Sequence, residues 1–348
     1  MTSIFRNVSE IPLDDYLDLI TDSFPNNIEL CVSLADILYR HIKQEDSKRT
    51  LVEYNGRSAS FQSHKFYSLL GQVFGTCQER EKDSLLCYYK TNLYAANLKP
   101  EVVKKNRNVF SFRNINEFSL ADMSNNTITV VSPLKMNDPS DTLIYDWADA
   151  KYNHWKNIEQ ARGLIDVPII GSLFRSGEIY KESFEKYRVR SFCESRNGRI
   201  PYQNTLMWSH YAGGHTGYCI EYSLSREMQA KRYSTGYLCT RAINYISLPI
   251  NLEEKVEEYG EDLLFAKSSD WAYENEVRML TYDYGVDKDF MCIPLDSDSS
   301  IVSIYFGVKC REESKQMIRN ILKDCEGIKF YQMKKDYTNI YTLKAEEL

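Results

Sequence analysis

The amino-acid sequence predicts an α+β protein in which an all-helical N-terminal domain, residues 1–105, precedes a mixed-sheet α+β domain, residues 106–348. Apolar residues recur at helical spacing before Pro100, and short alternating runs typical of strands begin soon after it. The chain ends in a strand–helix–strand pattern. A length of 348 residues is enough for two such domains.

The helical part carries its clearest signal after a Pro-Asn-Asn break at 25–27. The residues that share one helix face there are Leu30, Leu34, Ile37, Leu38 and His41. Two more helices are expected at 62–78 and 81–97. Because this part holds no recognisable catalytic motif, we expect an accessory domain that regulates activity, docks a protein partner or mediates self-association.

The second part alternates strands with turns and helices. Strands are expected at 109–113, 127–131, 189–193, 217–222 and 277–281. The Asn, Asp and Pro residues of 133–141 predict a turn, because Asx side chains bond to nearby backbone and proline fixes its own φ. Helices are expected within 141–187 and at 205–212.

The C-terminal pattern is a strand at 301–306, a helix at 312–325 and a strand at 328–333. Before it, residues 253–262 include six acids and one lysine, which is typical of a solvated helix face.

Composition limits the classes of partner. A net charge of -6 argues against binding that relies on phosphate neutralisation along a nucleic acid. The nine cysteines are scattered without a Cys-x-x-Cys pair, and the N-terminus has no apolar signal region. We therefore expect reduced thiols, a cytoplasmic location and no membrane partner.

Residues 207–222 are the densest in groups suited to chemistry, with a tryptophan, two histidines, a Gly-Gly hinge and a strand that carries Glu221. Walker, Rossmann and Gly-x-Ser-x-Gly motifs are absent from the chain. His210 and His215 are five residues apart, which places them on different helix faces, and no third ligand has a suitable spacing. No metal site is predicted.

Five ordered motifs resemble a bacterial family catalogued as domain of unknown function 2971. They are Asn137-Asp138-Pro139, Ser191-Phe192, Met207–Tyr211 with Gly217 and Cys219–Tyr222, Trp271 with Tyr273–Arg278, and Ile304–Gly307. The resemblance covers about 106–343 and implies no settled activity.

A weaker resemblance implies a reaction. Mono-ADP-ribosyltransferases of the Arg-Ser-Glu type place an arginine on a first strand, a serine on a later strand and a Glu-x-Glu loop before another. Arg113, Ser191 and the pair Glu274 and Glu276 occur here in that order, although Ser-Phe-Cys replaces the usual Ser-Thr-Ser. The resemblance implies an ADP-ribosyltransferase-like fold, NAD as substrate and a macromolecular acceptor.

In that chemistry, cleavage of the nicotinamide glycosidic bond develops an oxocarbenium ion, which a carboxylate stabilises. The resemblance assigns this role to Glu276, assisted by Glu274, with Arg113 on a phosphate and Ser191 on the ribose or the glutamate. Trp208, His210 and Tyr211 would supply stacking and donor groups of the dinucleotide pocket. In a bacterium, an enzyme of this kind is expected to act as a toxin or a defence effector.

Structural roles are open for the same residues. Glu276 could form an ion pair with Arg278 or Arg190, and Arg113 could be structural. Asn137 and Asp138 fit a turn, and Trp208 fits a packed anchor.

Two other functional classes also stay open. A carboxylate-based hydrolase, either a nuclease or a glycosidase, would use Glu221, Glu276, Asp138 and His210, with the two glutamates paired for acid/base work. A non-enzymatic sensor or scaffold would bind a ligand in a Tyr-rich pocket.

Overall fold

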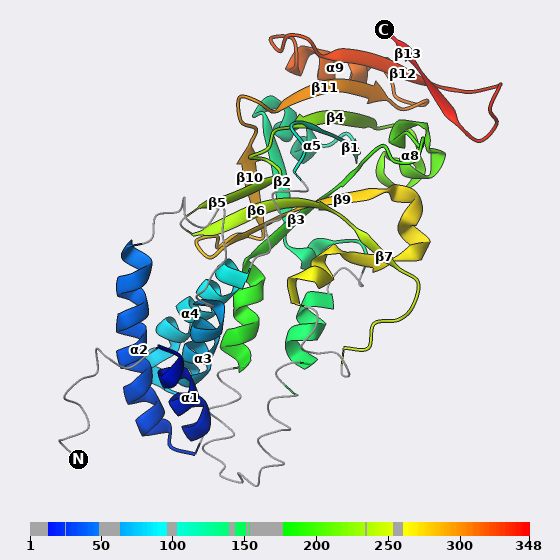
Figure 1. Ribbon diagram of the computed structural model, residues 1–348. Helices are drawn as coiled ribbons and strands as arrows, with labels where there is room; N and C mark the ends of the chain where they lie inside the picture. Colours follow the sequence, from blue (N-terminus) through cyan, green and yellow to red (C-terminus); the bar gives the residue numbers. More distant parts are fainter. Residues whose placement is uncertain are drawn as a thin grey trace.

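The computed structural model describes residues 13–24, 26–48, 63–95, 103–138, 143–150, 153, 177–233, 235–252 and 260–348. Helices gather at one end of the molecule and a large curved sheet at the other (Figure 1), which confirms the α+β class. Within these ranges, no helix is long and apolar enough to cross a membrane.

The N-terminal helices follow the predicted order. They are α1 Leu13–Ser23, α2 Ile28–Lys48, α3 Ser63–Gly75 and α4 Glu81–Ala95. The first three bury a shared apolar cluster that includes Ile20, Leu38 and Phe74. Helix α4 also packs on the sheet, because Tyr88, Tyr89 and Leu93 join a second cluster with strand residues.

Eleven strands form the large sheet, ordered β13-β12-β11-β4-β1-β3-β9-β6-β5, with β2 and β10 off this path. Their bounds are β1 Arg107–Arg113, β2 Thr127–Val131, β3 Tyr187–Cys193, β4 Tyr218–Leu224, β5 Ala230–Tyr233, β6 Gly236–Ala242, β9 Glu276–Asp283, β10 Phe290–Pro294, β11 Ser300–Phe306, β12 Lys329–Lys335 and β13 Leu343–Glu347. All strand pairs in it are antiparallel except β11 with β12.

The exception is the predicted C-terminal strand–helix–strand unit. Helix α9, Glu312–Ile321, connects β11 to β12 and is four residues shorter at its C-terminal end than the sequence indicated. It buries Ile318 against the sheet face that also receives α5, Glu117–Ser124. Helix α5 was not predicted from the sequence, although Asn116 and Ser119 form a reciprocal capping box at its start.

Along one edge of β3 the sheet divides between two partner strands, and this division is called the fork of β3. Strand β1 pairs with it at Phe110 and Cys193, near one end, and β2 pairs with it at Val131 and Val189, near the other. Residues 190–192 lie between these two contacts. The opposite edge of β3 pairs continuously with β9, so the sheet is closed on one side of β3 and split on the other.

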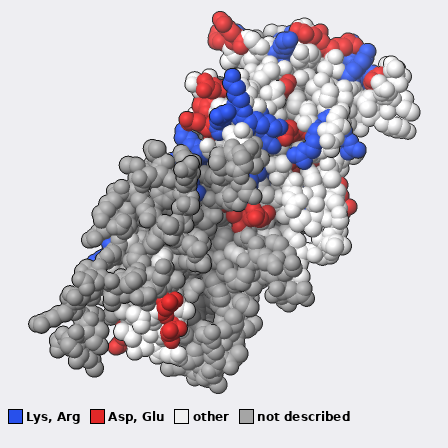
Figure 2. All heavy atoms as spheres, in the orientation of Figure 1, with Lys and Arg blue, Asp and Glu red and all other residues white. Residues whose placement is uncertain are grey.

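A short two-stranded sheet of β7, Asn244–Ile246, and β8, Ala266–Ser268, lies beside the main sheet and precedes the 3-10 helix Ser269–Glu274. The expected solvated acidic helix at 253–262 falls mostly outside the described residues. Glu261 departs from that expectation, because it accepts a hydrogen bond from the buried Tyr237 and pairs with Arg241. Elsewhere on the sheet end, the visible face carries Lys and Arg side chains mixed with acidic ones (Figure 2).

Candidate functional site

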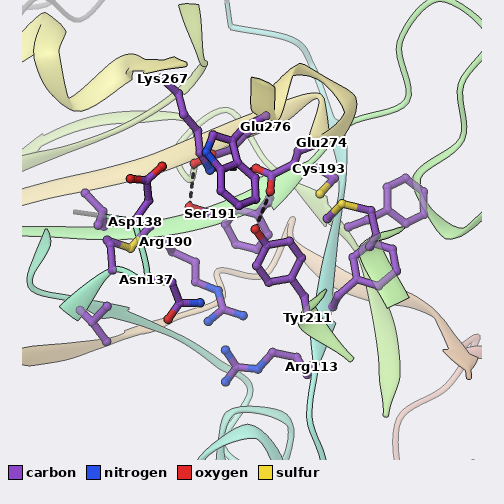
Figure 3. Close-up of a pocket in the computed structure, with 18 of the residues that line it drawn as sticks. Arg113, Asn137, Asp138, Arg190, Ser191, Cys193, Tyr211, Lys267, Glu274 and Glu276 are labelled. Carbon is purple, nitrogen blue, oxygen red and sulfur yellow. Dashed lines mark hydrogen bonds and ion pairs between the residues drawn. The ribbon is translucent and has the colours of Figure 1, made fainter. Parts of the chain in front are cut away.

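A pocket of about 260 Å³ opens where β1 and β2 separate along β3. Its wall includes residues from β1, β2 and β3, the segment 135–138, helix α8 Thr205–Tyr211, and the start of β9. Seven of the residues predicted for the site line it: Arg113, Asn137, Asp138, Ser191, Tyr211, Glu274 and Glu276. The split in the sheet therefore brings together motifs that are far apart in the sequence (Figure 3).

Glu276 is the most heavily bonded group of the pocket and is only 1% exposed. Its Oε1 accepts a 2.6 Å hydrogen bond from the Ser191 hydroxyl and a 2.8 Å bond from Arg278 Nε. Its Oε2 accepts a 2.9 Å bond from Lys267 Nζ. Burial alone would raise the pKa of Glu276, but Arg278 and Lys267 outweigh it and lower the pKa to about 2. Glu276 is therefore anionic at neutral pH.

Glu274 joins the same network through Lys267. Lys267 Nζ donates a 2.9 Å bond to Glu274 Oε2 as well as to Glu276, and the Tyr211 hydroxyl donates a 2.5 Å bond to Glu274 Oε1. Burial opposes the charge of Lys267, but attraction to the two glutamates prevails and raises its pKa. The two carboxylates are thus balanced by two cations, Lys267 and Arg278, and the formal charge of the four groups is zero.

The other end of the pocket is cationic. Arg113, at the end of β1, pairs with Asp122 at 3.0 Å. Arg190, in the fork of β3, donates a 2.6 Å bond to the Ser111 hydroxyl. Their guanidinium groups lie next to one another (Figure 3). Burial and the nearby charge of Arg113 lower the pKa of Arg190 to about 10, so Arg190 is charged at neutral pH.

The Glu-x-Glu motif has a local structural cause. Asn275 ends the 3-10 helix in a left-handed conformation, with φ of 47°, which asparagine tolerates better than most residues. Its carbonyl accepts a hydrogen bond from the Glu194 amide, which anchors the turn to the end of β3. Because of this turn at Asn275, the flanking residues Glu274 and Glu276 both accept a hydrogen bond from Lys267.

The Gly-rich stretch after α8 fixes the position of Arg113. A Cβ on Gly217 would lie 2.2 Å from the Arg113 carbonyl oxygen, so a side chain there would push away the end of β1. Asn204 caps the start of helix α8, because its side chain accepts a 3.0 Å bond from the Leu206 amide. This capped helix places Tyr211, in its last turn, at the pocket wall.

Trp208 and His210 do not line the pocket. Trp208 is fully buried, packs edge-on against Phe112 at 5.2 Å and donates a 2.8 Å bond to the Tyr202 carbonyl. It is therefore a packed anchor. His210 is exposed on the opposite helix face, beside Trp271 and Tyr273.

Glu221 lies on β4, two strands away from β3, and also stays outside the pocket. It accepts bonds from Asn108 at 3.0 Å and from the Tyr305 hydroxyl at 2.9 Å. The expected pairing of Glu221 with Glu276 is wrong, because β1 and β3 separate them. Strand alternation indicates which face a residue takes, but it does not reveal which strands will be neighbours.

The sequence offered two possible ion-pair partners for Glu276, namely Arg278 and Arg190. The Arg278 ion pair forms, whereas Arg190 bonds to Ser111 instead of Glu276.

Lys267 was missed by sequence reasoning, since its three-residue strand carries no recognisable pattern. Burial raises the pKa of Cys193, another wall residue, well above its usual value and keeps it a neutral thiol. No group of three metal-ligating side chains occurs among the described residues.

Part of the chain is similar to a known protein family. The family model described as a protein of unknown function, DUF2971, matches residues 207–279. No curated protein and no solved structure matches the chain. The matched segment contains the whole Lys267–Glu274–Glu276–Arg278 network, while Arg113, Arg190 and Ser191 precede it. The match supports the resemblance to the DUF2971 family and contains two of the five ordered motifs, Met207–Tyr222 and Trp271–Arg278.

Proposed function

We propose that the protein is an NAD-dependent ADP-ribosyltransferase-like enzyme that cleaves the nicotinamide glycosidic bond and transfers ADP-ribose to a macromolecular acceptor. The observation that carries the proposal is the meeting of Arg113, Ser191 and Glu276, from three different strands, in one pocket. Their order along the chain motivated the idea, and their common pocket supports it.

The proposed reaction separates a neutral nicotinamide, which leaves with the electron pair of the glycosidic bond. The ribose becomes an oxocarbenium ion until a nucleophile of the acceptor bonds to it and loses a proton. The anionic Glu276 suits stabilisation of positive charge, and its low pKa rules it out as a proton donor at neutral pH. Because Ser191 donates to Glu276, its oxygen can still accept a hydrogen bond from a ribose hydroxyl.

The residues available fit part of a dinucleotide. A volume of about 260 Å³ is close to the lower end of ordinary ligand pockets, about 300 Å³. It suits the nicotinamide–ribose–phosphate half, with the adenosine outside. Trp271 and Tyr211 offer aromatic surface next to Lys267 and Glu274 of the network. Arg113 lies at the opposite, cationic end of the pocket (Figure 3).

The helical part has a proposed role as well. Helix α4 shares a core with Tyr187 and Leu280, on the two strands that carry Ser191 and Glu276. A partner or second copy bound to the N-terminal helices would therefore act on strands that form the pocket. We retain cytoplasmic action as a toxin or defence effector within this proposal.

A second function is favoured by a different observation. Both pocket carboxylates are nearly buried and fully balanced by Lys267 and Arg278, which weakens their field at a developing cation. A non-enzymatic sensor that binds a nucleotide without turnover needs no such field. The hydrolase alternative lacks comparable support, because Glu221 and His210 stay outside the pocket.

Incubation with NAD labelled in the nicotinamide and adenine parts, with and without cell extract, tests the proposal. We expect nicotinamide release and labelled protein, both abolished by Glu276→Gln but retained by Glu227→Gln, which changes an exposed carboxylate paired with Lys231. Saturable NAD binding without release would favour the sensor. The absence of release, labelling and binding would refute both.

A further inference from the structure

We infer that Arg113 and Arg190 together form a binding site for the phosphate groups of a nucleotide, with Arg190 as its principal cation. The site lies within the pocket of the proposed function and gives the ligand its orientation. It does not depend on NAD cleavage, because it follows from the charges at the fork of β3.

The charge balance at this end of the pocket is incomplete. Asp122 is the carboxylate that pairs with Arg113, and it is already engaged by the Thr129 hydroxyl at 2.5 Å. Arg190 forms no ion pair with any residue that the structure describes; its bonded partner is the neutral Ser111 hydroxyl. Two guanidinium groups therefore share one carboxylate, in contrast to the balanced glutamate network nearby.

A surplus cation in a sheltered pocket is costly unless an anion accompanies it. The arrangement is more costly here because the two like charges are adjacent (Figure 3). Burial, and after it the charge of Arg113, lowers the pKa of Arg190. That pKa of about 10 is still far above neutral, so Arg190 does not relieve the repulsion by losing its proton. A bound anion would relieve it.

The geometry indicates a phosphate. Ser111 engages one terminal nitrogen of Arg190, and the ring of Phe192 lies 5.8 Å from its guanidinium carbon, which leaves other N–H groups for the pocket. Arginine's planar fork matches phosphate oxygens in bidentate fashion. Two forks side by side suit a phosphate dianion or pyrophosphate better than a single carboxylate.

The neighbouring residue then sets the direction of the ligand. Ser191 follows Arg190 directly on β3 and bonds to Glu276. Adjacent strand residues point to opposite faces, but Arg190 and Ser191 both line the pocket where the sheet splits. A phosphate held by Arg190 and a sugar at the Ser191–Glu276 pair would therefore occupy the same pocket. This order, with phosphate at the arginines and sugar at the carboxylate, is the order found in a nucleotide.

The test measures binding to the 348-residue chain by calorimetry, with pyrophosphate, AMP and adenosine as probes. We expect pyrophosphate and AMP to bind and adenosine to bind at least tenfold more weakly, since a phosphate adds charge-assisted bonds. Arg190→Met should weaken pyrophosphate binding at least tenfold. Arg226→Met, which removes the same charge from an exposed position, should leave it unchanged.

The thermal midpoint of the ligand-free variant separates binding from a structural role. If Arg190 serves an anion, Arg190→Met removes a repelling charge and should melt no lower than the parent. Arg190→Lys, which keeps the charge without the fork, should bind pyrophosphate with intermediate affinity and serves if the methionine variant fails to fold. Binding of pyrophosphate by Arg190→Met or Arg190→Lys as tight as by the parent, or of adenosine as tight as of AMP, would overturn the inference.

This experiment and the NAD assay fail separately. Phosphate binding without nicotinamide release would keep the anion site and refute the proposed reaction. Nicotinamide release that is as fast in Arg190→Met as in the parent would keep the proposed reaction and refute the anion site.

Discussion

The Ser191 hydroxyl lies 2.6 Å from Glu276 Oε1 and donates a hydrogen bond to it across neighbouring strands. Ser191 pairs in register with Arg278, which bonds to the same oxygen. A neutral donor on β3 and a cation on the neighbouring strand β9 thus bond to the same carboxylate oxygen. Each of the two donors can be removed by a separate substitution.

Ser191→Ala should lower nicotinamide release about tenfold or more while costing about 1 kcal/mol of stability, because one donor is lost and both cations stay. Release assays and urea unfolding measure the two effects. Ser209→Ala, which removes an exposed hydroxyl outside the pocket, is the matched control. Unchanged release in Ser191→Ala would exclude its role in the reaction.

Glu276 should contribute a defined pH dependence to stability. Its folded-state pKa, about 2, is depressed below the ordinary value of 4.5, so its contribution is complete above pH 4.5 and is lost as pH falls toward 2. The contribution is of the order of 3 kcal/mol. The stability difference between the parent and Glu276→Gln should therefore shrink over that interval in urea unfolding. A difference independent of pH would show that the carboxylate is not held as its contacts indicate.

Gly217→Ala should be more damaging than Gly214→Ala. The Cβ at 217 would meet the Arg113 carbonyl at 2.2 Å, whereas at 214, with φ of 60°, no atom lies within 4 Å. We expect a loss of about 3 kcal/mol or more for the first, from overpacking, and about 1 kcal/mol for the second, from left-handed backbone. Thermal unfolding of both variants gives the comparison. Equal losses would mean that the contact with Arg113 is readily relieved.

Adjacent residues of α8 should behave differently. His210→Ala should leave ligand binding unchanged, because His210 is exposed outside the pocket. Tyr211→Phe removes the hydroxyl that bonds to Glu274 and should weaken binding or turnover severalfold. Calorimetry with ADP-ribose would distinguish them. A stronger effect of His210→Ala would restore that residue to the site.

The order of the secondary structure elements was largely predictable. Apolar alternation located β1, β2, β3, β4, β9 and β11, and helical spacing located α2 and α9. Residues such as Val109 or Ile318 reveal their environment through neighbours two or four positions away, which the sequence displays directly. The three residues of β8 were missed because they contain too few positions to show a period. The seven-residue strand β6, Gly236–Ala242, was not predicted either.

The composition of the pocket depended on tertiary structure. The sequence indicated Arg113, Ser191 and Glu276 through their order, and it indicated Arg278 as a partner of Glu276. It carried no sign of Lys267 between two glutamates or of Arg190 beside Arg113. Those relationships arise from the pairing of β3 with β9 and from its fork toward β1 and β2.

The sequence by itself thus determined the α+β class, the family motifs and the charged residue types available for a site. The tertiary structure decided which of those charges are balanced and which stay in surplus. The reason is physical: local periodicity depends on residues a few positions apart, whereas the balance of buried charges depends on which distant strands become neighbours.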